Sequence, residues 1–336
     1  MTNKQNHRKV LILGHDTRSF LSVIRSLGRY GCEVHAGDCP PNSPALFSRY
    51  IKKIHFMPEY GASAERWKKT LTAILEKESF DLVVPCHDEN IIPLQSNRAF
   101  FEKMARIYLL DDSVFELASN KCKATMHAQA LGIPVPNFVI IKNEGNVGNI
   151  KAQISFPAVM KPVFSFTADN IKSRNEVRII RDAEEFSAAM EFMPSDQDIL
   201  LQEYFEGRGT GVEVLARDGE ILFAFQHIRI HESPLGVSAY RKSVPLNGEL
   251  FIASQKLLKS IGYSGVAMLE FKVNERTKEW KFIEINGRFW GSLPLAVSAG
   301  ADFPRFLYEV LLGKREEFIQ NYKTDIYCRN LTMDID

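Results

Sequence analysis

Short apolar runs alternate with amphipathic segments along the first third of the chain. Residues 9–14 form an almost continuous apolar run that ends in glycine, which predicts a buried parallel strand. The segment after it repeats apolar side chains at the spacing of one helix face: Phe20, Val23, Ile24 and Leu27. Two more strands are predicted at 33–38 and 81–85, with a helix at 66–78 between them. This order of elements predicts a right-handed parallel α/β unit.

Tight turns interrupt the pattern in the rest of the chain. Asp218-Gly219 is typical of a hairpin turn, and the polar stretch 274–278 predicts a second one. Strands are predicted at 156–162, 199–207, 210–216, 221–230, 266–273 and 282–286. Helices are predicted at 121–131, 182–193, 251–261, 293–299 and 303–312. Residues 321–336 carry no clear signal and fit either a tail or a terminal strand.

Acidic and amide side chains stand inside two of these predicted strands. Glu284 and Asn286 are two residues apart, so they point to the same face of a strand. Glu270 lies among Val, Met, Leu and Phe, where a carboxylate is costly to bury without a partner or a metal. We expect Glu270 and Glu284 on adjacent antiparallel strands. Hard oxygen ligands of this kind suit Mg²⁺, although structural salt bridges would also account for two strand carboxylates.

Glu270 together with residues 284–288 resembles the metal-binding end of the ATP-grasp superfamily. Within it, the chain is similar to carboxylate–amine ligase-like members related to the large subunit of carbamoyl phosphate synthase, from the first strand to about residue 313. The resemblance implies an N-terminal Rossmann-like (pre-ATP-grasp) parallel α/β domain, followed by a two-lobed α+β ATP-grasp domain. The implied divisions are residues 1–112, an N-terminal lobe at 113–196, a C-terminal lobe at 197–320 and a tail at 321–336.

The same resemblance implies the metal and phosphate ligands. Mg²⁺ would bind Glu270, Glu284 and Asn286, and Gly287 would let the chain turn so that Arg288 returns to their face. Lys121, which follows the helix-capping Asn120, matches a lysine that faces nucleotide phosphate. Lys161 ends an apolar strand, where an ammonium is suited to phosphate or to the adenine edge.

The loop after Lys161 departs from the family pattern. Residues 163–170 contain no glycine, whereas the family typically has a glycine-rich loop over the phosphates. The Ser165 hydroxyl is the expected substitute donor, together with that of Thr167.

Residues 199–207 resemble the hinge strand whose backbone reads the adenine edge. Tyr204 and Phe205 match by position, and Glu203 is expected to reach the adenine amino group. For the ribose hydroxyls three readings stay open: Glu206 binds them, Glu213 binds them, or neither does.

Two arginines are candidate anchors for phosphate or for a substrate carboxylate. Guanidinium groups bind both anions through paired hydrogen bonds, which favours Arg229 and Arg241, although exposed sheet charge would also explain them. The resemblance implies that both face the active site. His227 and His231 would be bases or, more commonly, merely hydrogen-bonded side chains.

Composition narrows the class of protein. The chain has 336 residues, 45% hydrophobic and 25% charged, with a net charge of +1, which gives no field to attract nucleic acid or membrane. Five scattered cysteines favour reduced thiols in a cytoplasmic protein. The stretch after the first strand is not GxGxxG, which disfavours a dinucleotide-dependent oxidoreductase. The loop 85–90 would contact substrate or simply begin a helix.

The expected activity follows from the resemblance. An ATP-dependent ligase would phosphorylate a small-molecule carboxylate to an acylphosphate, which an amine would then attack, releasing ADP and phosphate. ATP and Mg²⁺ (or Mn²⁺), with two ions, are the implied cofactors, and a homodimer is the implied assembly. The alternatives are a nucleotide-binding ATP-grasp protein without turnover, and a kinase or carboxylase-like step on another acceptor such as bicarbonate.

Overall fold

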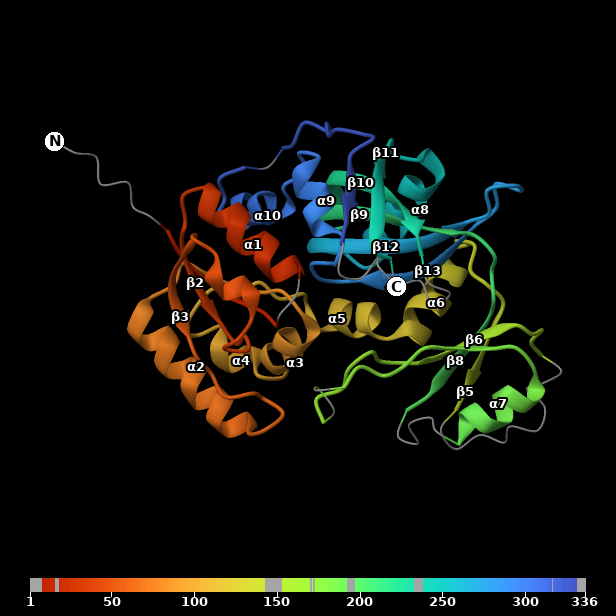
Figure 1. Cartoon of the computed structure of the whole chain (residues 1–336), viewed down its shortest axis with the longest axis horizontal. Coiled ribbons are helices and arrows are strands. Elements are labelled where there is room, and N and C mark those ends of the chain that lie inside the picture. The colour runs from red at the N-terminus through yellow and green to blue at the C-terminus, as the bar shows by residue number, and fades with distance from the viewer. Residues whose placement is uncertain are drawn as a thin grey trace. The chain divides into compact units, whose positions relative to one another are not determined.

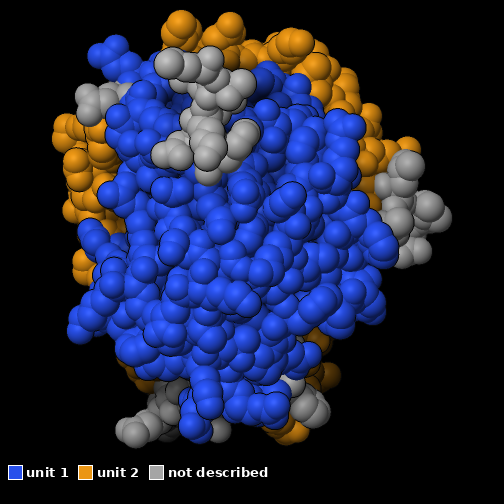
Figure 2. All heavy atoms as spheres, turned by 90° about the vertical axis from the view of Figure 1, so that its left-hand side faces the viewer, with its two compact units in different colours: residues 1–112, 166–173, 288–318 blue, residues 113–165, 174–287, 319–336 orange. Residues whose placement is uncertain are grey.

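A computed structural model describes residues 8–15, 18–142, 153–169, 171, 173–191, 197–232, 238–315 and 317–330 (Figure 1). The chain divides into two compact units, coloured separately in Figure 2. Unit 1 comprises Met1–Asp112, Phe166–Ser173 and Arg288–Phe318. Unit 2 comprises Ser113–Ser165, Arg174–Gly287 and Ile319–Asp336. The division into four sequential parts remains a prediction, and each unit is described by itself.

A four-stranded parallel sheet forms the centre of unit 1. Its strand order is β3-β2-β1-β4, with β1 at Lys9–Leu13, β2 at Glu33–Gly37, β3 at Ile51–His55 and β4 at Leu82–Pro85. Three of these strands lie where the apolar runs predicted them. The pattern missed β3, because this edge strand carries the exposed Lys52 and Lys53 in place of an apolar run.

Helices from both ends of the chain complete unit 1. They are α1 (Arg18–Arg29), the short 3₁₀ turn η1 (Pro44–Phe47), α2 (Ala64–Glu78), α3 (Asp88–Ser96), α4 (Arg98–Phe101), α9 (Leu293–Ser298) and α10 (Phe303–Leu311). Both α9 and α10 contact α1. The Ser26 hydroxyl of α1 donates to Asp302, the residue that precedes α10, over 2.5 Å. The predicted C-terminal lobe at 197–320 would include these two helices, whereas the structure packs them on α1 of unit 1.

Unit 2 holds two antiparallel sheets. The smaller has the order β5-β8-β6-β7, formed by β5 (Phe138–Ile141), β6 (Ala158–Pro162), β7 (Arg178–Ile180) and β8 (Ile199–Glu203). Helix α7 (Ala183–Met190) packs against it through Phe186, which joins Met160 and Leu201 in one buried apolar cluster.

The larger sheet has six strands in the order β13-β12-β9-β10-β11-β14. They are β9 (Arg208–Arg217), β10 (Glu220–His231), β11 (Tyr240–Val244), β12 (Gly265–Val273), β13 (Trp280–Asn286) and β14 (Tyr327–Arg329). Every pairing in it is antiparallel. Helices α5 (Asp112–Ser119), α6 (Lys121–Ala130) and α8 (Gly248–Ser260) accompany this unit, with α8 against β9 and β10 and α6 against β13. The end of the chain thus includes a strand, one of the two readings left open for it.

The observed architecture confirms the predicted fold class. A parallel α/β sheet comes first, and antiparallel sheets with covering helices follow it. In the part of the chain that the structure describes, no helix has both the length and the apolar character needed to span a bilayer. The predicted acids lie on β12 and β13, so the strands of unit 2 carry the candidate metal-binding residues.

Candidate nucleotide and metal site

Glu270 and Glu284 are direct cross-strand partners on β12 and β13. Asn286 completes the group, since its Nδ2 donates to Glu270 Oε1 and to Glu284 Oε1, both over 3.2 Å. Side chains of opposed residues in an antiparallel pair share one face of the sheet. The expected adjacency of the two acids is therefore confirmed, and all three predicted metal ligands gather at one point.

These three side chains have the chemistry of a hard-cation site. Two carboxylates and an amide oxygen are ligands that Mg²⁺ and Mn²⁺ accept, while no thiol or imidazole is among them. The amide of Asn286 now directs its nitrogen at both acids, and a half-turn of this amide would direct Oδ1 there instead. The donor set therefore fits the metal that the resemblance implies.

Three cationic side chains surround Glu284. Burial alone would raise the pKa of its carboxyl group, but the charges of Lys121, Lys161 and Arg174 outweigh burial and hold that pKa below its ordinary value. Glu284 is consequently ionised at neutral pH. The two lysines were predicted from the sequence, whereas Arg174 was not, because it lies in a polar stretch without any periodic signal.

Lys161 and Lys121 reach this place from different elements. Lys161 lies in β6 and is only 7% exposed; burial lowers its pKa, against the opposing pull of Glu284 and Glu270. Lys121 begins α6, with Asn120 as its cap. Its Nζ donates to Ser165 Oγ over 2.9 Å, which brings together two residues predicted to face phosphate. The arrangement presents positive charge beside the carboxylate pair.

Arg229 and Arg241 are opposed residues on β10 and β11. The guanidinium of Arg229 is bonded to Glu270 Oε2 and to Glu232 Oε1, the latter over 3.0 Å, and its side chain is 10% exposed. Burial lowers its pKa, but the two carboxylates more than offset this and raise it. The Arg229 side chain is therefore not a solvated surface charge, and it touches one of the predicted metal ligands.

Along the chain, the predicted hinge residues connect the smaller sheet of unit 2 to the larger one. Glu203 ends β8, and Asn137 Nδ2 donates to its Oε2 over 2.9 Å. Tyr204 follows with its backbone N–H bonded to Pro157 O over 3.0 Å, and Lys272 Nζ lies 4.9 Å from its ring centroid. Phe205 is half-buried. These contacts fix the hinge backbone, and its proposed role toward adenine remains a prediction.

The two acids considered for the ribose have opposite environments. Glu206 is 79% exposed and lies 3.7 Å from Arg276. Glu213 is fully buried in β9, with its Oε1 3.0 Å from Nδ1 of the equally buried His227. The Glu213 carboxylate thus lies against the His227 ring, and burial lowers the pKa of this imidazole. Glu206 is the more accessible of the two candidates.

Arg288 belongs to unit 1, although Asn286 belongs to unit 2. Its Nε donates to Asp88 Oδ2 over 2.8 Å, at the first residue of α3. His87, which precedes α3, lies 3.2 Å from Glu89. The stretch 85–90 therefore does begin a helix, while substrate contact there and the return of Arg288 toward Glu284 stay predictions.

Known proteins resemble this chain in sequence and in fold. Residues 195–333 match a family model described as ATP-grasp in the biosynthetic pathway with Ter operon. D-aspartate ligase of Enterococcus faecium (strain Aus0004) is 22% identical over 321 aligned residues, covering 89% of this chain and 75% of that protein.

Solved structures show the same fold. L-amino acid ligase from Bacillus licheniformis superposes with a TM-score of 0.67 at 18% identity, over 92% of this chain and 75% of its own. The biotin carboxylase domain of the Hydrogenobacter thermophilus 2-oxoglutarate carboxylase, in complex with MgADP, ADP and bicarbonate, gives 0.72 at 19% identity, over 96% and 74%.

The matched region 195–333 contains the acid pair, Asn286 and both candidate arginines. The match in sequence and the match in fold therefore point the same way as the motif. The chain is similar in sequence and in fold to ATP-grasp proteins, among them the D-aspartate and L-amino acid ligases.

Proposed function

We propose that this protein is an ATP-dependent ligase that activates a small-molecule carboxylate as an acylphosphate and joins it to an amine. The observation that carries the proposal is the cluster on unit 2 in which Glu270, Glu284 and Asn286 meet beside Lys161. Two acids and an amide hold a cation, and the buried ammonium supplies charge for phosphate oxygens. Phosphoryl transfer needs positioning and electrostatic stabilisation of this kind and no nucleophilic side chain.

Each group of residues has a proposed role that follows from its chemistry. Mg²⁺ held by Glu270, Glu284 and Asn286 would neutralise charge on the β- and γ-phosphates. Lys121 and Lys161 would bind phosphate oxygens through their ammonium groups, and Ser165 would orient Lys121. Arg229 and Arg241 would bind the carboxylate that receives the phosphoryl group. Arg288 is proposed as a further cation for the phosphoryl group in transfer.

The formation of a C–N bond rests on the relatives. D-aspartate ligase and L-amino acid ligase are both named for amino acids, so we propose an amino acid or a related compound as one substrate. A carboxylase among the structural neighbours keeps bicarbonate as the second candidate acceptor. Cytoplasmic location, a homodimer and a second metal ion remain predictions.

The test measures ADP release from the purified protein with Mg²⁺ and ATP, in three arms: pooled amino acids, pooled small carboxylates and bicarbonate. Glu284→Ala is expected to lower ADP release by at least about 100-fold, since it removes one ligand of the proposed cation. Glu220→Ala is the matched control, because Glu220 is 57% exposed on β10 and pairs with the exposed Lys259.

Each outcome distinguishes between the proposed ligase and its alternatives. ADP that depends on the amino-acid pool and disappears in Glu284→Ala supports the ligase, and splitting the pool names the substrates. ADP that depends on bicarbonate alone supports the carboxylase-like alternative. Turnover that persists in Glu284→Ala contradicts the proposed site. ATP binding without ADP in any arm favours a protein that binds nucleotide and does not turn it over.

A further inference from the structure

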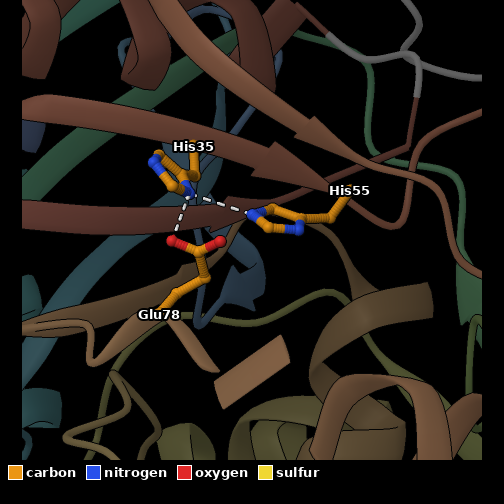
Figure 3. A group of neighbouring side chains, drawn as sticks. All are labelled: His35, His55 and Glu78. Atoms are coloured by element: carbon orange, nitrogen blue, oxygen red, sulfur yellow. Dashed lines mark hydrogen bonds and ion pairs between the residues drawn. The ribbon is translucent and has the colours of Figure 1, made fainter. Parts of the chain in front are cut away.

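Three side chains meet in unit 1, whereas the acid pair described above belongs to unit 2. His35 comes from β2, His55 from the neighbouring edge strand β3, and Glu78 from the last turn of α2 (Figure 3). Figure 3 shows the Glu78 carboxylate and both imidazole rings directed at one point. None of the three has a part in the proposed ligase reaction, so the cluster calls for its own explanation.

The ligand atoms of this group lie close enough together for one small metal ion to reach them after small side-chain adjustments. His35 Nδ1 lies 2.9 Å from His55 Nε2 and 3.9 Å from Glu78 Oε2, and all three atoms lie within 4.8 Å of one another. A tetrahedral zinc ion with bonds of about 2.0–2.1 Å holds its ligand atoms roughly 3.3 Å apart. We propose that His35, His55 and Glu78 form a binding site for a divalent transition-metal ion of the zinc class.

A second observation supports the proposal. The other nitrogen of His35, Nε2, lies 3.2 Å from Glu33 Oε1. In protein metal sites, the ring nitrogen of a histidine that does not bind the metal is commonly bonded to a carboxylate. This bond fixes the orientation of the histidine ligand. The ring of Phe80 packs edge-on against both imidazoles, with centroid distances of 5.2 and 6.1 Å. Both rings are therefore held in place before any ion binds.

Two lysines occupy the Glu78 carboxylate and would compete with the ion. Lys53 is bonded to Oε1, and Lys9 Nζ lies 3.1 Å from Oε2. The Lys53 side chain is 45% exposed and can move into solvent, whereas Lys9 also lies 3.8 Å from Glu33. The rival interpretation is an ion-pair network that merely joins β3 to α2. The two interpretations can be distinguished by experiment. Removing Lys53 should increase the affinity for Zn²⁺ only if the three side chains are metal ligands.

The ligand set also selects the class of ion. Two imidazoles favour Zn²⁺, Cu²⁺, Ni²⁺ or Co²⁺ over Mg²⁺ and Ca²⁺, which prefer oxygen. The site is therefore distinct in chemistry from the all-oxygen group around Glu270 and Glu284. Three protein ligands leave one tetrahedral position for water or an outside ligand. A bound ion would also cross-link the edge strand β3 to β2 and α2.

The experiment titrates Zn²⁺ into the full-length, chelator-treated protein by calorimetry, with Co²⁺ absorption as a second, spectroscopic readout. The Glu284→Ala variant serves as the background, because it weakens the oxygen site in unit 2. One equivalent of Zn²⁺ is expected to bind. His55→Ala and Glu78→Gln should each weaken this binding at least about 10-fold, and Glu33→Gln should weaken it about 10-fold through the orientation of His35.

The matched variant is Lys53→Met, which keeps the stem of the side chain and removes the competing charge. It should tighten Zn²⁺ binding, and circular dichroism of each variant checks that the fold is retained. No Zn²⁺ binding, or binding unchanged in both His55→Ala and Glu78→Gln, would overturn the proposal. Weaker Zn²⁺ binding in Lys53→Met would also overturn the proposal, because it would show that the lysine supports ion binding and does not compete with it. These readouts do not depend on ligase turnover.

Discussion

Charged residues inside these sheets are stabilised by charges of opposite sign within hydrogen-bonding distance. Arg229 lies between Glu232 and Glu270. A buried charge without a partner costs several kcal/mol, so each of these groups depends on its neighbour. Removing Arg229 would therefore leave both Glu232 and Glu270 without this partner.

Single residues could be predicted from the sequence when their spacing alone fixed their geometry. Glu284 and Asn286 share a strand face because they are two residues apart, and the short polar turn before them brings Glu270 alongside. Arg174 and the partner of Glu213 could not be predicted, since neither has a periodic signal. Their positions depend on which strands become neighbours, and that is decided by the whole sheet.

Asp38, which follows β2, gives a prediction about pH. Burial raises the pKa of its carboxyl group to about 6, although Asn90 Nδ2 donates to its Oδ2 over 2.7 Å. The folded protein then binds this proton more tightly than the unfolded chain does. The contribution of Asp38 to the free energy of unfolding should fall as the pH rises from about 4 to about 6, by up to roughly 3 kcal/mol.

Urea denaturation of the wild type and of Asp38→Asn, between about pH 4 and pH 7, measures this contribution. Asparagine cannot ionise and can still accept the bond from Asn90, so the variant should gain stability relative to the wild type across this window. A difference between the two proteins that does not change with pH would show that Asp38 ionises as freely as it does in the unfolded chain.

Among the elements, β1, β2, β4 and the long strands of the larger sheet were recognised from their apolar pattern, whereas β3, β5, β7 and β11 were not predicted, although β5 is wholly apolar. The missed strands β3 and β11 carry Lys52 and Lys53, and Arg241 and Lys242, at positions where an apolar alternation would be expected. The hairpin of β12 and β13 also departs from a regular ladder, because the register shifts between Glu270 and Phe271. Ile283 is the extra residue, since Glu270 faces Glu284 while Phe271 faces Phe282.

Close packing between β9 and β10 gives a prediction at this scale. Gly211 pairs with both Glu270 and His227 across the larger sheet. A Cβ atom at Gly211 would lie 2.4 Å from Cε1 of His227, which is buried and cannot move aside freely. Gly211→Ala should therefore lower the free energy of unfolding by about 1–3 kcal/mol.

A double-mutant cycle separates this clash from other effects of the added methyl group. In a His227→Ala background the ring is gone, so Gly211→Ala should change stability by less than about 0.5 kcal/mol. Urea denaturation of the four proteins gives the coupling energy. Equal losses in both backgrounds would mean that the methyl group meets something other than His227.

The whole molecule shows why unit 1 is not a contiguous piece of chain. Its first segment, Met1–Asp112, is completed by Arg288–Phe318, whose helices pack on α1. The contacts include Ser26 with Asp302, the edge-on rings of Tyr30 and Tyr308 at 5.7 Å, and a 2.6 Å bond from Arg106 Nη1 to Leu311 O. Local patterns cannot reveal such contacts, so the packing of α9 and α10 on α1 could not be predicted from the sequence.

A fragment of residues 1–112 should therefore lack a stable core. Without residues 288–318 the outer face of α1 is exposed, so the fragment should bind the dye ANS and lose its near-ultraviolet dichroism while it keeps secondary structure. Joining 288–318 to the fragment through a glycine-rich linker should restore fixed packing. A cooperative, dye-free fragment without this segment would show that α9 and α10 are dispensable.

The short strand at the end of the chain has a consequence for solubility. Residues 327–329 pair with Tyr240–Lys242 on β11, while Gln320 bonds both backbone groups of Ala224 and Tyr322 bonds Val244 O. These contacts occupy backbone groups that would otherwise recruit a strand from another molecule. The C-terminal segment thus protects the larger sheet from intermolecular strand pairing, and its removal would leave β11 as a template for aggregation.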